Sequence, residues 1–397
     1  MSADTLKDLE LLVRSRYGLI VLETDEDDRA AALLRHLADR LGLPFFAWSR
    51  TQGLRRDGAE GSVYATTDPR LALAHLERAA FPAIYHFRGL GAALGDADTG
   101  AHLAAAAAVF EKGSGAIVIT GTAVTLPEAA RARAAFVKLA GPSPDEYRAL
   151  IAHTLAELSA RGPVRMELSP EEMTRLVHTL NGLTLLEAGK VITRAIVEDG
   201  KLAADDVRVV AEAKRAIVER DGVLEYFPAE DALTDVAGMR RLKEWLAQRK
   251  AAIVRPGEAA AFGLDFPRGI LLVGVPGSGK SLCAKAVAGE WGLPLLKLDP
   301  SSLYNKYIGE SEKNFQRAMR TADRLAPVVL WIDEIEKAFA SGGEADGGVS
   351  QRILGTFLSW LQERKSNVFI VATCNDVTRL PPELLRKGRF DEIFFLD

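Results

Sequence analysis

The chain is short of the residues that build metal clusters and disulfide scaffolds. Its 397 residues include two cysteines and six histidines. Two cysteines are too few for a zinc cluster or for the disulfide framework of a small secreted protein, and no histidines are spaced as metal ligands. We therefore expect neither kind of site, and Cys283 and Cys374 are predicted to be small buried packing residues.

Long apolar runs and an excess of basic charge are also missing. No run reaches the roughly 18–20 apolar residues of a membrane span, and the first ten residues are too charged for a secretory signal peptide. The formal net charge is -4 and no stripe of Lys and Arg stands out, which disfavours a nucleic-acid-binding module. The sequence thus predicts a cytoplasmic protein without membrane contact.

Strand and helix patterns alternate twice along the chain. Apolar strand patterns occur at 18–24, 44–49, 83–87, 116–120, 269–274, 293–298, 328–332 and 368–373, with helical stretches between them. Strand patterns fade after Pro144, and a helix start is predicted at Ser169-Pro170. Such alternation predicts parallel sheets with crossover helices. The predicted division is an α/β core over 1–145, a helical cap over 146–220, a linker over 221–234 and a second α/β module over 235–397.

The most specific motif is a glycine-rich loop at residues 274–281, Gly-Val-Pro-Gly-Ser-Gly-Lys-Ser. It fits the pattern G-x-x-x-x-G-K-[ST] between a predicted strand and a predicted helix. Backbone N–H groups of such a loop and of the helix N-terminus stabilise phosphate charge. Lys280 would reach the β- and γ-phosphates, and the Ser281 hydroxyl would ligate Mg²⁺. The predicted nucleotide contacts here are Pro276, Gly277, Ser278, Gly279, Lys280, Ser281 and Leu282.

Polar residues follow two later strands of the second module. Asp333 and Glu334 end the strand at 328–332, and Asn375 follows the strand at 368–373. Open α/β sheets bind ligands at the carboxyl ends of their strands. Asp333 would hold Mg²⁺, directly or through water, Glu334 would activate the attacking water, and Asn375 would hold that water. Alone, the acidic pair is also compatible with a solvated strand end, and Asn375 is more typical of an Asn that ends a strand in a turn. Together with the phosphate loop they indicate ATP hydrolysis.

Two arginines, Arg386 and Arg389, lie in the basic segment 385–391 near the end of the chain. An arginine supplied by a neighbouring subunit can stabilise the charge of the transition state in phosphoryl transfer. Taken alone, the segment is more typical of a basic surface loop.

In this order the motifs resemble the ATPase core of the AAA family, in its protein-remodelling branch. The resemblance covers 235–397 and rests on Asp-Val-Ala-Gly at 235–238, the phosphate loop, Trp-Ile-Asp-Glu at 331–334, Asn375 and segment 385–391. It implies that Arg386 and Arg389 act on a neighbour's ATP, and that the protein forms a homo-oligomeric ring, expected to be a hexamer, with ATP and Mg²⁺ as cofactors. It also implies three further residues near the adenine, Val236, Ala237 and Gly238.

Residues 304–312 resemble the central-pore loop of the same family. By this resemblance Tyr307 and Ile308 would grip a polypeptide client, because an aromatic ring gives apolar contact that tolerates many sequences. The glycine-rich segment 342–348 would be a second pore loop. The residues themselves leave open that Tyr307 packs in a core and that 342–348 is a flexible acidic turn.

Residues 1–220 resemble a degenerate module of the same family with its helical lid. After the strand at 18–24 stands Thr-Asp-Glu-Asp-Asp, residues 24–28, in place of a phosphate loop. These acids suit a helix N-terminus but would repel phosphates, so we predict that this module does not bind ATP. An inactive front module with an active rear one resembles a poorly characterised group of bacterial, cyanobacterial and plastid-encoded AAA proteins. The second module lacks its C-terminal lid in this sequence, whose apolar ending, 394–397, is expected to be a cut edge.

Three functions follow from these observations. The first is a ring-forming ATPase that threads or disassembles a protein client. The second is a nucleotide-switched regulator that recruits a partner through its N-terminal module without threading. The third, a nucleic-acid motor, is the least favoured because the charge is not basic. The sequence does not name the client or the pathway.

Overall fold

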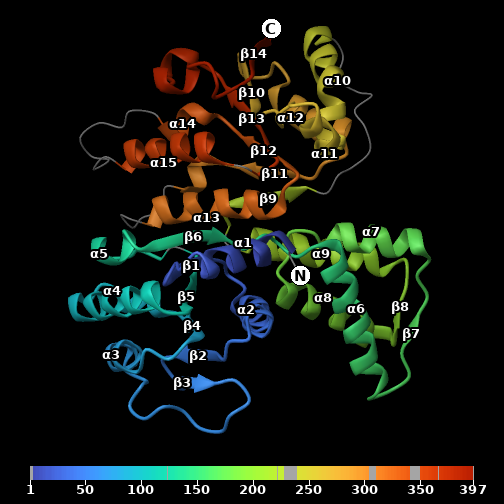
Figure 1. Ribbon diagram of the computed structural model, residues 1–397. Helices are drawn as coiled ribbons and strands as arrows, with labels where there is room; N and C mark the ends of the chain where they lie inside the picture. Colours follow the sequence, from blue (N-terminus) through green and yellow to red (C-terminus); the bar gives the residue numbers. More distant parts are fainter. Residues whose placement is uncertain are drawn as a thin grey trace. The chain divides into compact units, whose positions relative to one another are not determined.

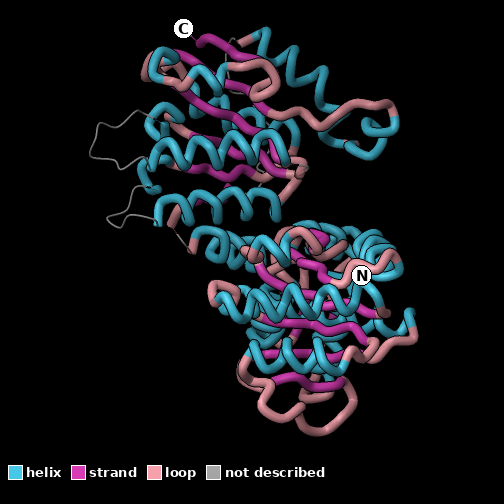
Figure 2. Tube along the Cα trace, turned by 60° about the vertical axis from the view of Figure 1, so that its left-hand side comes forward, coloured by secondary structure: helices cyan, strands magenta, loops and turns pink. Residues whose placement is uncertain are grey.

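The computed structural model describes residues 3–122, 124–220, 222–227, 239–303, 310–339, 349–364 and 366–396. The chain divides into two compact units. One comprises Met1–Gly162 and Thr184–Lys190, and the other comprises Pro163–Leu183 and Val191–Asp397. Each unit contains a six-stranded, mainly parallel sheet with helices on both faces (Figures 1 and 2). The predicted fold class, two α/β modules built on parallel sheets, is confirmed.

The strands of the first unit are β1 (Leu19–Glu23), β2 (Phe45–Ser49), β3 (Gly53–Arg56), β4 (Ala83–Arg88), β5 (Gly115–Gly121) and β6 (Ala134–Lys138). Their order in the sheet is β3-β2-β4-β5-β1-β6. All neighbours run parallel except the edge strand β3, which is antiparallel to β2. The central strands β1, β4 and β5 are almost wholly buried, as expected of parallel strands covered on both faces.

The helices of the first unit are α1 (Ala3–Arg14), α2 (Asp27–Leu41), α3 (Pro69–Ala79), α4 (Ala97–Lys112), α5 (Glu128–Arg131) and α6 (Pro144–Ser159). Helices α1 and α2 cover one face of the sheet, where their leucines pack against Ile20 and Leu22 of β1. Helices α3 and α4 cover the other face, against Leu19 and Val21 (Figure 1). Alternate residues of one strand thus supply two separate cores.

The strands of the second unit are β7 (Arg165–Met166), β8 (Lys201–Leu202), β9 (Leu224–Phe227), β10 (Gly269–Gly274), β11 (Leu295–Leu298), β12 (Val328–Ile332), β13 (Val368–Cys374) and β14 (Glu392–Leu396). Strands β7 and β8 pair with each other, and the other six form a sheet in the order β14-β10-β13-β12-β11-β9. Strand β9 is antiparallel to β11, whereas the other pairs are parallel. Part of the segment predicted as a linker, 221–234, is therefore the edge strand of this sheet.

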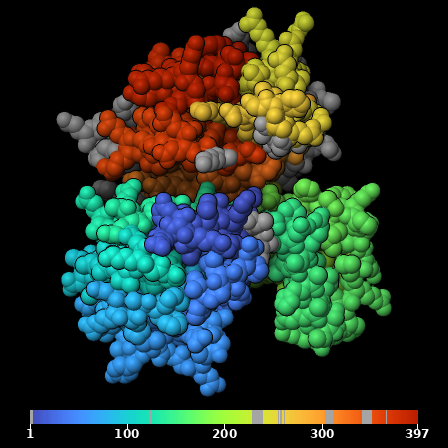
Figure 3. All heavy atoms as spheres, viewed as in Figure 1, coloured from blue at the N-terminus to red at the C-terminus, as the bar shows by residue number. Residues whose placement is uncertain are grey.

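The helices of the second unit are α7 (Pro170–Leu180), α9 (Asp206–Glu219), α10 (Arg240–Val254), α11 (Pro256–Ala261), α12 (Lys280–Trp291), α13 (Glu310–Leu325), α14 (Ile335–Phe339) and α15 (Val349–Glu363); α8 (Leu185–Asp199) has residues in both units. Helices α10 and α12 cover one face of the sheet, and α13, α14 and α15 cover the other. Figure 3 shows α10 and α11, in yellow, on the surface of this unit. Among the described helices, none is both long and apolar enough to cross a bilayer.

The turn between α7 and α8 packs against the end of α13 within the second unit. Asn181 donates a side-chain hydrogen bond to the carbonyl oxygen of Ala326 at 3.4 Å. Gly182 has a φ of +85°, and a Cβ there would lie 2.9 Å from Cα of Leu325, so only glycine fits. Lys214 is buried and donates to the carbonyl oxygen of Asn181 at 2.7 Å. Residues 163–183 and 191–220, predicted as part of a lid of the first module, thus share a compact unit with the second sheet.

Candidate active site

The glycine-rich loop joins β10 to α12 at the carboxyl edge of the second sheet. Gly277 and Gly279 have φ values of +87° and +84°, in the left-handed region that favours glycine. Gly274 is required for another reason: a Cβ there would lie 2.3 Å from the carbonyl oxygen of Leu396 in β14. The glycines therefore serve both the tight loop and its close approach to the neighbouring strand.

Lys280 is the first residue of α12 and is nearly buried. Its Nζ donates to the carbonyl oxygens of Gly274 at 2.7 Å and Val275 at 2.8 Å, which holds the ammonium against the start of the loop. The buried Oγ of Ser278 has no hydrogen-bond partner among the described residues. Buried hydroxyls are normally satisfied, and a phosphate oxygen in the loop would satisfy this one. The loop therefore fits a bound nucleotide phosphate.

Asp333 and Glu334 follow β12 directly and are held from the next strand, β13. The Thr373 hydroxyl donates to Oδ1 of Asp333 at 2.7 Å and accepts the backbone N–H of Glu334 at 2.9 Å. Glu334 has a φ of +48°, a conformation uncommon for residues other than glycine. The side-chain amide of Asn375 donates to Oε1 of Glu334 at 2.8 Å. The structure thus brings the predicted Glu334 and Asn375 into direct contact.

Glu334 stays ionised in this setting. The carboxylate forms an ion pair with Lys337, one turn along the chain, through Oε2. The hydrogen bond from Lys337 is the main cause that lowers the pKa of Glu334; burial opposes it, and the hydrogen bond from Asn375 lowers the pKa further. A deprotonated carboxylate is the form that accepts a proton from water.

Three residues near this edge were missed by the motifs. Glu336 is 6 % exposed, and its Oε1 accepts the backbone N–H of Asn375 at 2.9 Å. Thr373 is fully buried and joins both acids. Lys337 pairs with Glu334. The sequence signals for these residues are weak. Thr373 is a single hydroxyl in an apolar strand, and Glu336 and Lys337 are one more acid and one base after the acidic pair of the motif.

The side chains at this edge include two oxygen donors, of Ser281 and Asp333, of the kind that Mg²⁺ accepts. In the part of the chain that is described, no three His, Cys, Asp or Glu side chains are grouped to hold a metal. Ser281 follows β10 and Asp333 follows β12, with β13 between them, so the two strands lie about 10 Å apart. Mg²⁺ typically takes one or two protein ligands together with phosphates and waters. A hydroxyl and a carboxylate on either side of a phosphate match this preference.

The two arginines of segment 385–391 have different surroundings. Arg386 is exposed, whereas Arg389 donates to the carbonyl oxygen of Leu358 at 3.0 Å. Asp391 fixes the end of the segment, because its carboxylate accepts the backbone N–H groups of Arg268 at 2.6 Å and of Gly269 at 3.0 Å. The segment is therefore anchored beyond Arg386, and that guanidinium lies on the surface.

Several predicted contacts fall outside the described residues. These are the adenine segment and both pore loops, namely Val236, Ala237, Gly238, Tyr307, Ile308 and 342–348.

The first sheet has a corresponding edge without the same chemistry. In the two sheets Thr120 and Thr373 occupy equivalent positions: Thr120 is level with Leu22 in β1, and Thr373 with Leu272 in β10. The residue paired with Thr120 on β4 is Arg88. A cation thus stands where the second sheet has Asp333.

The loop after β1 is too short to wrap a phosphate in the same way. In the first sheet, Leu22 is level with Thr120, and four residues, 23–26, separate it from the start of α2. In the second sheet, Leu272 is level with Thr373, and seven residues, 273–279, separate it from the start of α12. Helix α2 then begins with Asp27 and Asp28, where α12 begins with a lysine and a serine.

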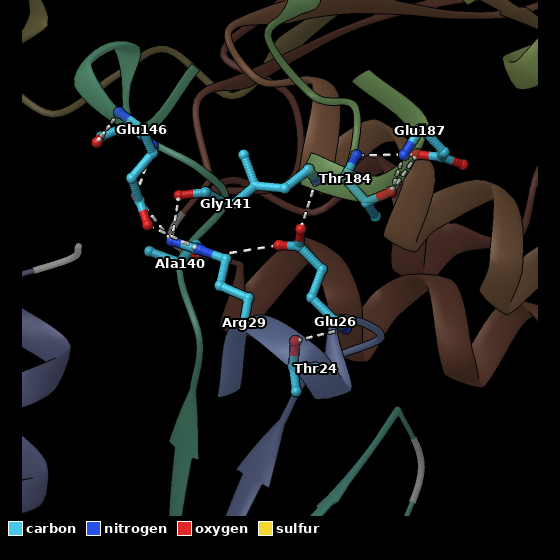
Figure 4. A network of polar contacts seen from close by, with 10 residues as sticks. Thr24, Glu26, Arg29, Ala140, Gly141, Glu146, Thr184 and Glu187 are labelled. Atoms are coloured by element: carbon cyan, nitrogen blue, oxygen red, sulfur yellow. Dashed lines mark hydrogen bonds and ion pairs between the residues drawn. The ribbon is translucent and has the colours of Figure 1, made fainter. Parts of the chain in front are cut away.

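A nearly buried ion-pair network follows this short loop (Figure 4). Arg29 is 7 % exposed at its side chain and pairs with Glu26 at 3.0 Å and, through two nitrogens, with Glu146 at 3.0 and 3.1 Å. The same guanidinium donates to the carbonyl oxygens of Ala140 at 2.6 Å and Gly141 at 3.2 Å. All five N–H donors of the arginine are therefore used within the first unit.

Glu26 extends the network to α8 by accepting the backbone N–H of Leu185 at 2.7 Å. Burial raises the pKa of Glu26, and it outweighs the hydrogen bond from Leu185 and the charge of Arg29. For Glu146, burial again acts to raise the pKa, but the hydrogen bonds from Arg29 and from the backbone of Ser143 together lower it to about 2. The two carboxylates thus share one guanidinium.

Three family models match consecutive parts of the chain. The SpoVK-like AAA ATPase N-terminal domain matches residues 5–139, the SpoVK-like AAA ATPase second domain matches 145–221, and the ATPase family associated with various cellular activities (AAA) matches 270–397.

Similar proteins cover either nearly the whole chain or about half of it. An uncharacterized AAA domain-containing protein, ycf46, of Pyropia yezoensis is 34% identical over 98% of this chain and 78% of its own. The ycf46 protein of Guillardia theta is 32% identical over 98% of this chain and 76% of its own. An ATP-dependent zinc metalloprotease FtsH of Slackia heliotrinireducens is 34% identical over 47% of this chain and 24% of its own.

Proposed function

The chain belongs to the AAA family of ATPases, and we propose that it binds and hydrolyses ATP with Mg²⁺ and works as a homo-oligomeric ring, expected to be a hexamer, that remodels a protein client. One observation carries the proposal. A phosphate loop and two polar strand ends meet at one edge of the sheet, where Asn375 donates to Glu334. Positioned charges of this kind are what phosphoryl transfer requires.

Each residue of the site has a proposed part in this reaction. Lys280 binds the β- and γ-phosphates, and the other loop residues, 276–282, surround them. Ser281 and Asp333 would hold Mg²⁺, which supplies charge neutralisation at the phosphates when bound. Glu334 takes a proton from the attacking water, and Asn375 orients that water. The lowered pKa of Glu334 supports this part, because the carboxylate is then in its basic form.

The ring proposal rests on the arginine segment and on the family, whose members typically form rings. The exposed Arg386 would reach the ATP of a neighbouring subunit, as predicted. Arg389 was predicted to do the same, but its bond to Leu358 supports a part in holding the segment. Mixing Arg386→Ala with Lys280→Ala subunits, which should restore some turnover, tests the assignment of Arg386.

We propose that the first unit does not bind nucleotide. The support is threefold: the loop after β1 is three residues shorter than the phosphate loop, Arg88 stands at the position of Asp333, and Arg29 is fully engaged with Glu26 and Glu146. Its part would be to recruit a partner or client.

The test of the proposed function is ATP turnover by the purified chain, compared with the variants Lys280→Ala and Glu334→Gln. Turnover should be absent in both, while Glu334→Gln should still bind ATP and accumulate as rings, measured by mass photometry with and without ATP. Absence of turnover in the wild type with Mg²⁺, or turnover at the wild-type rate in either variant, would contradict the proposal.

A regulator that switches with nucleotide but does not thread its partner remains the alternative. Tyr307→Ala separates the two functions, because only threading needs the predicted pore contact. Intact partner-dependent activity in Tyr307→Ala, with loss in Glu334→Gln, would favour the regulator. Stimulation of turnover by nucleic acid at low salt would instead favour a nucleic-acid motor. A cytoplasmic location stays a prediction from composition.

A further inference from the structure

Thr373 is a fully buried hydroxyl in an otherwise apolar strand. Strand β13 reads Val-Phe-Ile-Val-Ala-Thr-Cys, with all seven residues buried. A hydroxyl there is costly to bury unless it is hydrogen-bonded on both sides. Thr373 meets that need, since it donates to Asp333 and accepts from the backbone of Glu334.

The two partners of Thr373 are the two carboxylate residues of the candidate site. The donated bond fixes Oδ1 of Asp333 and leaves Oδ2 for other partners. The accepted bond fixes the backbone of Glu334, the one residue of the described site, apart from the glycines, that has a left-handed φ. Backbone in that region persists where surrounding contacts determine it. One oxygen atom therefore sets both acids relative to each other.

A second contact joins the same two strand ends, this time from a side chain that follows β12 to the backbone after β13. Glu336 lies in α14, directly after the acids, and accepts the backbone N–H of Asn375 at 2.9 Å. Its other oxygen, Oε2, is buried without a hydrogen-bond partner among the described residues. The ends of β12 and β13 are thus joined twice, once through Thr373 and once through Glu336.

The first unit offers an internal comparison. Thr120 has the same register as Thr373, but its hydroxyl donates to Asp27 at 2.6 Å and contacts Nε2 of the buried His86 at 3.0 Å. No acid follows β4 there, because the strand ends at Arg88 and the next residues are Gly89 and Leu90. The same residue type at the same sheet position therefore joins two acids in the second unit only.

We propose that Thr373 is a positioning residue for ATP hydrolysis, whose hydroxyl holds the Mg²⁺-binding carboxylate of Asp333 and the water-activating Glu334 in their working arrangement. The proposal rests on the proposed function, and it adds a residue that the motifs do not contain. It concerns the chemical step and not nucleotide binding, because Thr373 lies at the acids while the phosphates are bound by the loop after β10.

The experiment compares Thr373→Val, which keeps shape and removes the hydroxyl, with Thr373→Ser, which keeps the hydroxyl. With one charge-linked and one backbone hydrogen bond lost, kcat should fall by about 10- to 100-fold in Thr373→Val. The KM for ATP should stay within about threefold, and Thr373→Ser should recover kcat to within about threefold of wild type. Thr120→Val is the matched control, for which turnover per folded chain should not change.

The outcomes separate this inference from the proposed function. If the wild type hydrolyses ATP and Thr373→Val has the same kcat, the inference is wrong and the proposed function stands. If Thr373→Ser loses as much kcat as Thr373→Val, the hydroxyl is not the cause and the inference also fails. If KM rises with kcat unchanged, Thr373 acts in binding. If the wild type has no turnover, the proposed function is wrong, and this inference, which rests on it, is wrong as well.

Discussion

The network around Arg29 allows a prediction with a calculable magnitude. In Arg29→Met the side chain keeps its length and loses the charge, which leaves Glu26 and Glu146 without their common partner. Their side chains are only 9 % and 11 % exposed. Removing one member of a buried ion pair typically costs about 3–5 kcal/mol, because an uncompensated charge remains. We expect a loss of this size for the segments that the network joins, α6 and the start of α8.

The pH dependence gives the same prediction a second measure. The pKa of Glu146 is lowered to about 2 from its ordinary 4.5, with burial opposing and Arg29 and Ser143 favouring the charged form. A lowered pKa in the folded state contributes stability above pH 4.5 that is lost as pH falls from 4.5 towards 2. In Arg29→Met this loss should become smaller. The contribution of Glu26 has the opposite sign: because its pKa is raised in the folded state, its contribution to stability is present below pH 4.5 and is lost as pH rises.

Hydrogen exchange is the suitable assay, because a chain with two units need not unfold in one step. The opening free energy of amides in α6 and of Leu185 should fall by about 3–5 kcal/mol in Arg29→Met, while that of α12 should not change. Arg40→Met is the control, since Arg40 lies on the same helix but forms an exposed pair with Glu10, worth about 0–1 kcal/mol. Equal effects of the two substitutions would refute the argument that Arg29 holds these segments.

Three further predictions concern the ATPase site. Lys280→Ala should lose ATP binding at least tenfold, whereas Glu334→Gln should keep it, as measured with a fluorescent ATP analogue; a tight Lys280→Ala would contradict the phosphate contact. Arg386→Ala should bind ATP but lose turnover, and a mixture with Lys280→Ala should regain some, because the intact arginine of one subunit completes the intact ATP site of another; no regain would argue against action between subunits. Lys337→Met should move the acid limb of the kcat–pH profile upwards, since Lys337 lowers the pKa of Glu334; an unmoved limb would show that this pair does not influence the base.

Local sequence patterns predicted much of this fold, because the bounds of these strands and helices are determined by residues within or next to each element. The strands at 269–274 and 328–332 occur at the predicted bounds, since each is an apolar run closed by glycine or acids. The helix start at Ser169 was also predictable: Ser169 accepts the backbone N–H of Glu172, whose carboxylate accepts the backbone N–H of Ser169 in return.

What the sequence did not predict depends on contacts between distant residues. Strand β6 was missed, because its residues are only partly buried or exposed and its apolar pattern is weak. The network of Arg29 joins residues 117 positions apart in the chain, which no local pattern encodes. The same holds for Thr373, whose two bonds cross from β13 to the end of β12. The phosphate loop, by contrast, carries its chemistry in eight consecutive residues.

Strand β9 bears on where the ATPase unit can be cut. The motifs place the start of that unit at residue 235, but β9 at 224–227 supplies the last strand of its sheet and pairs with all four residues of β11. Glu225 of this strand also pairs with Lys297 of β11 at 3.3 Å. A fragment that begins at residue 235 would expose the N–H and C=O groups of β11 as an open edge, and such edges recruit strands from other molecules. A fragment that begins at 222 would keep the edge closed, so the 13 residues before the first motif decide whether the isolated ATPase unit has an open, aggregation-prone sheet edge.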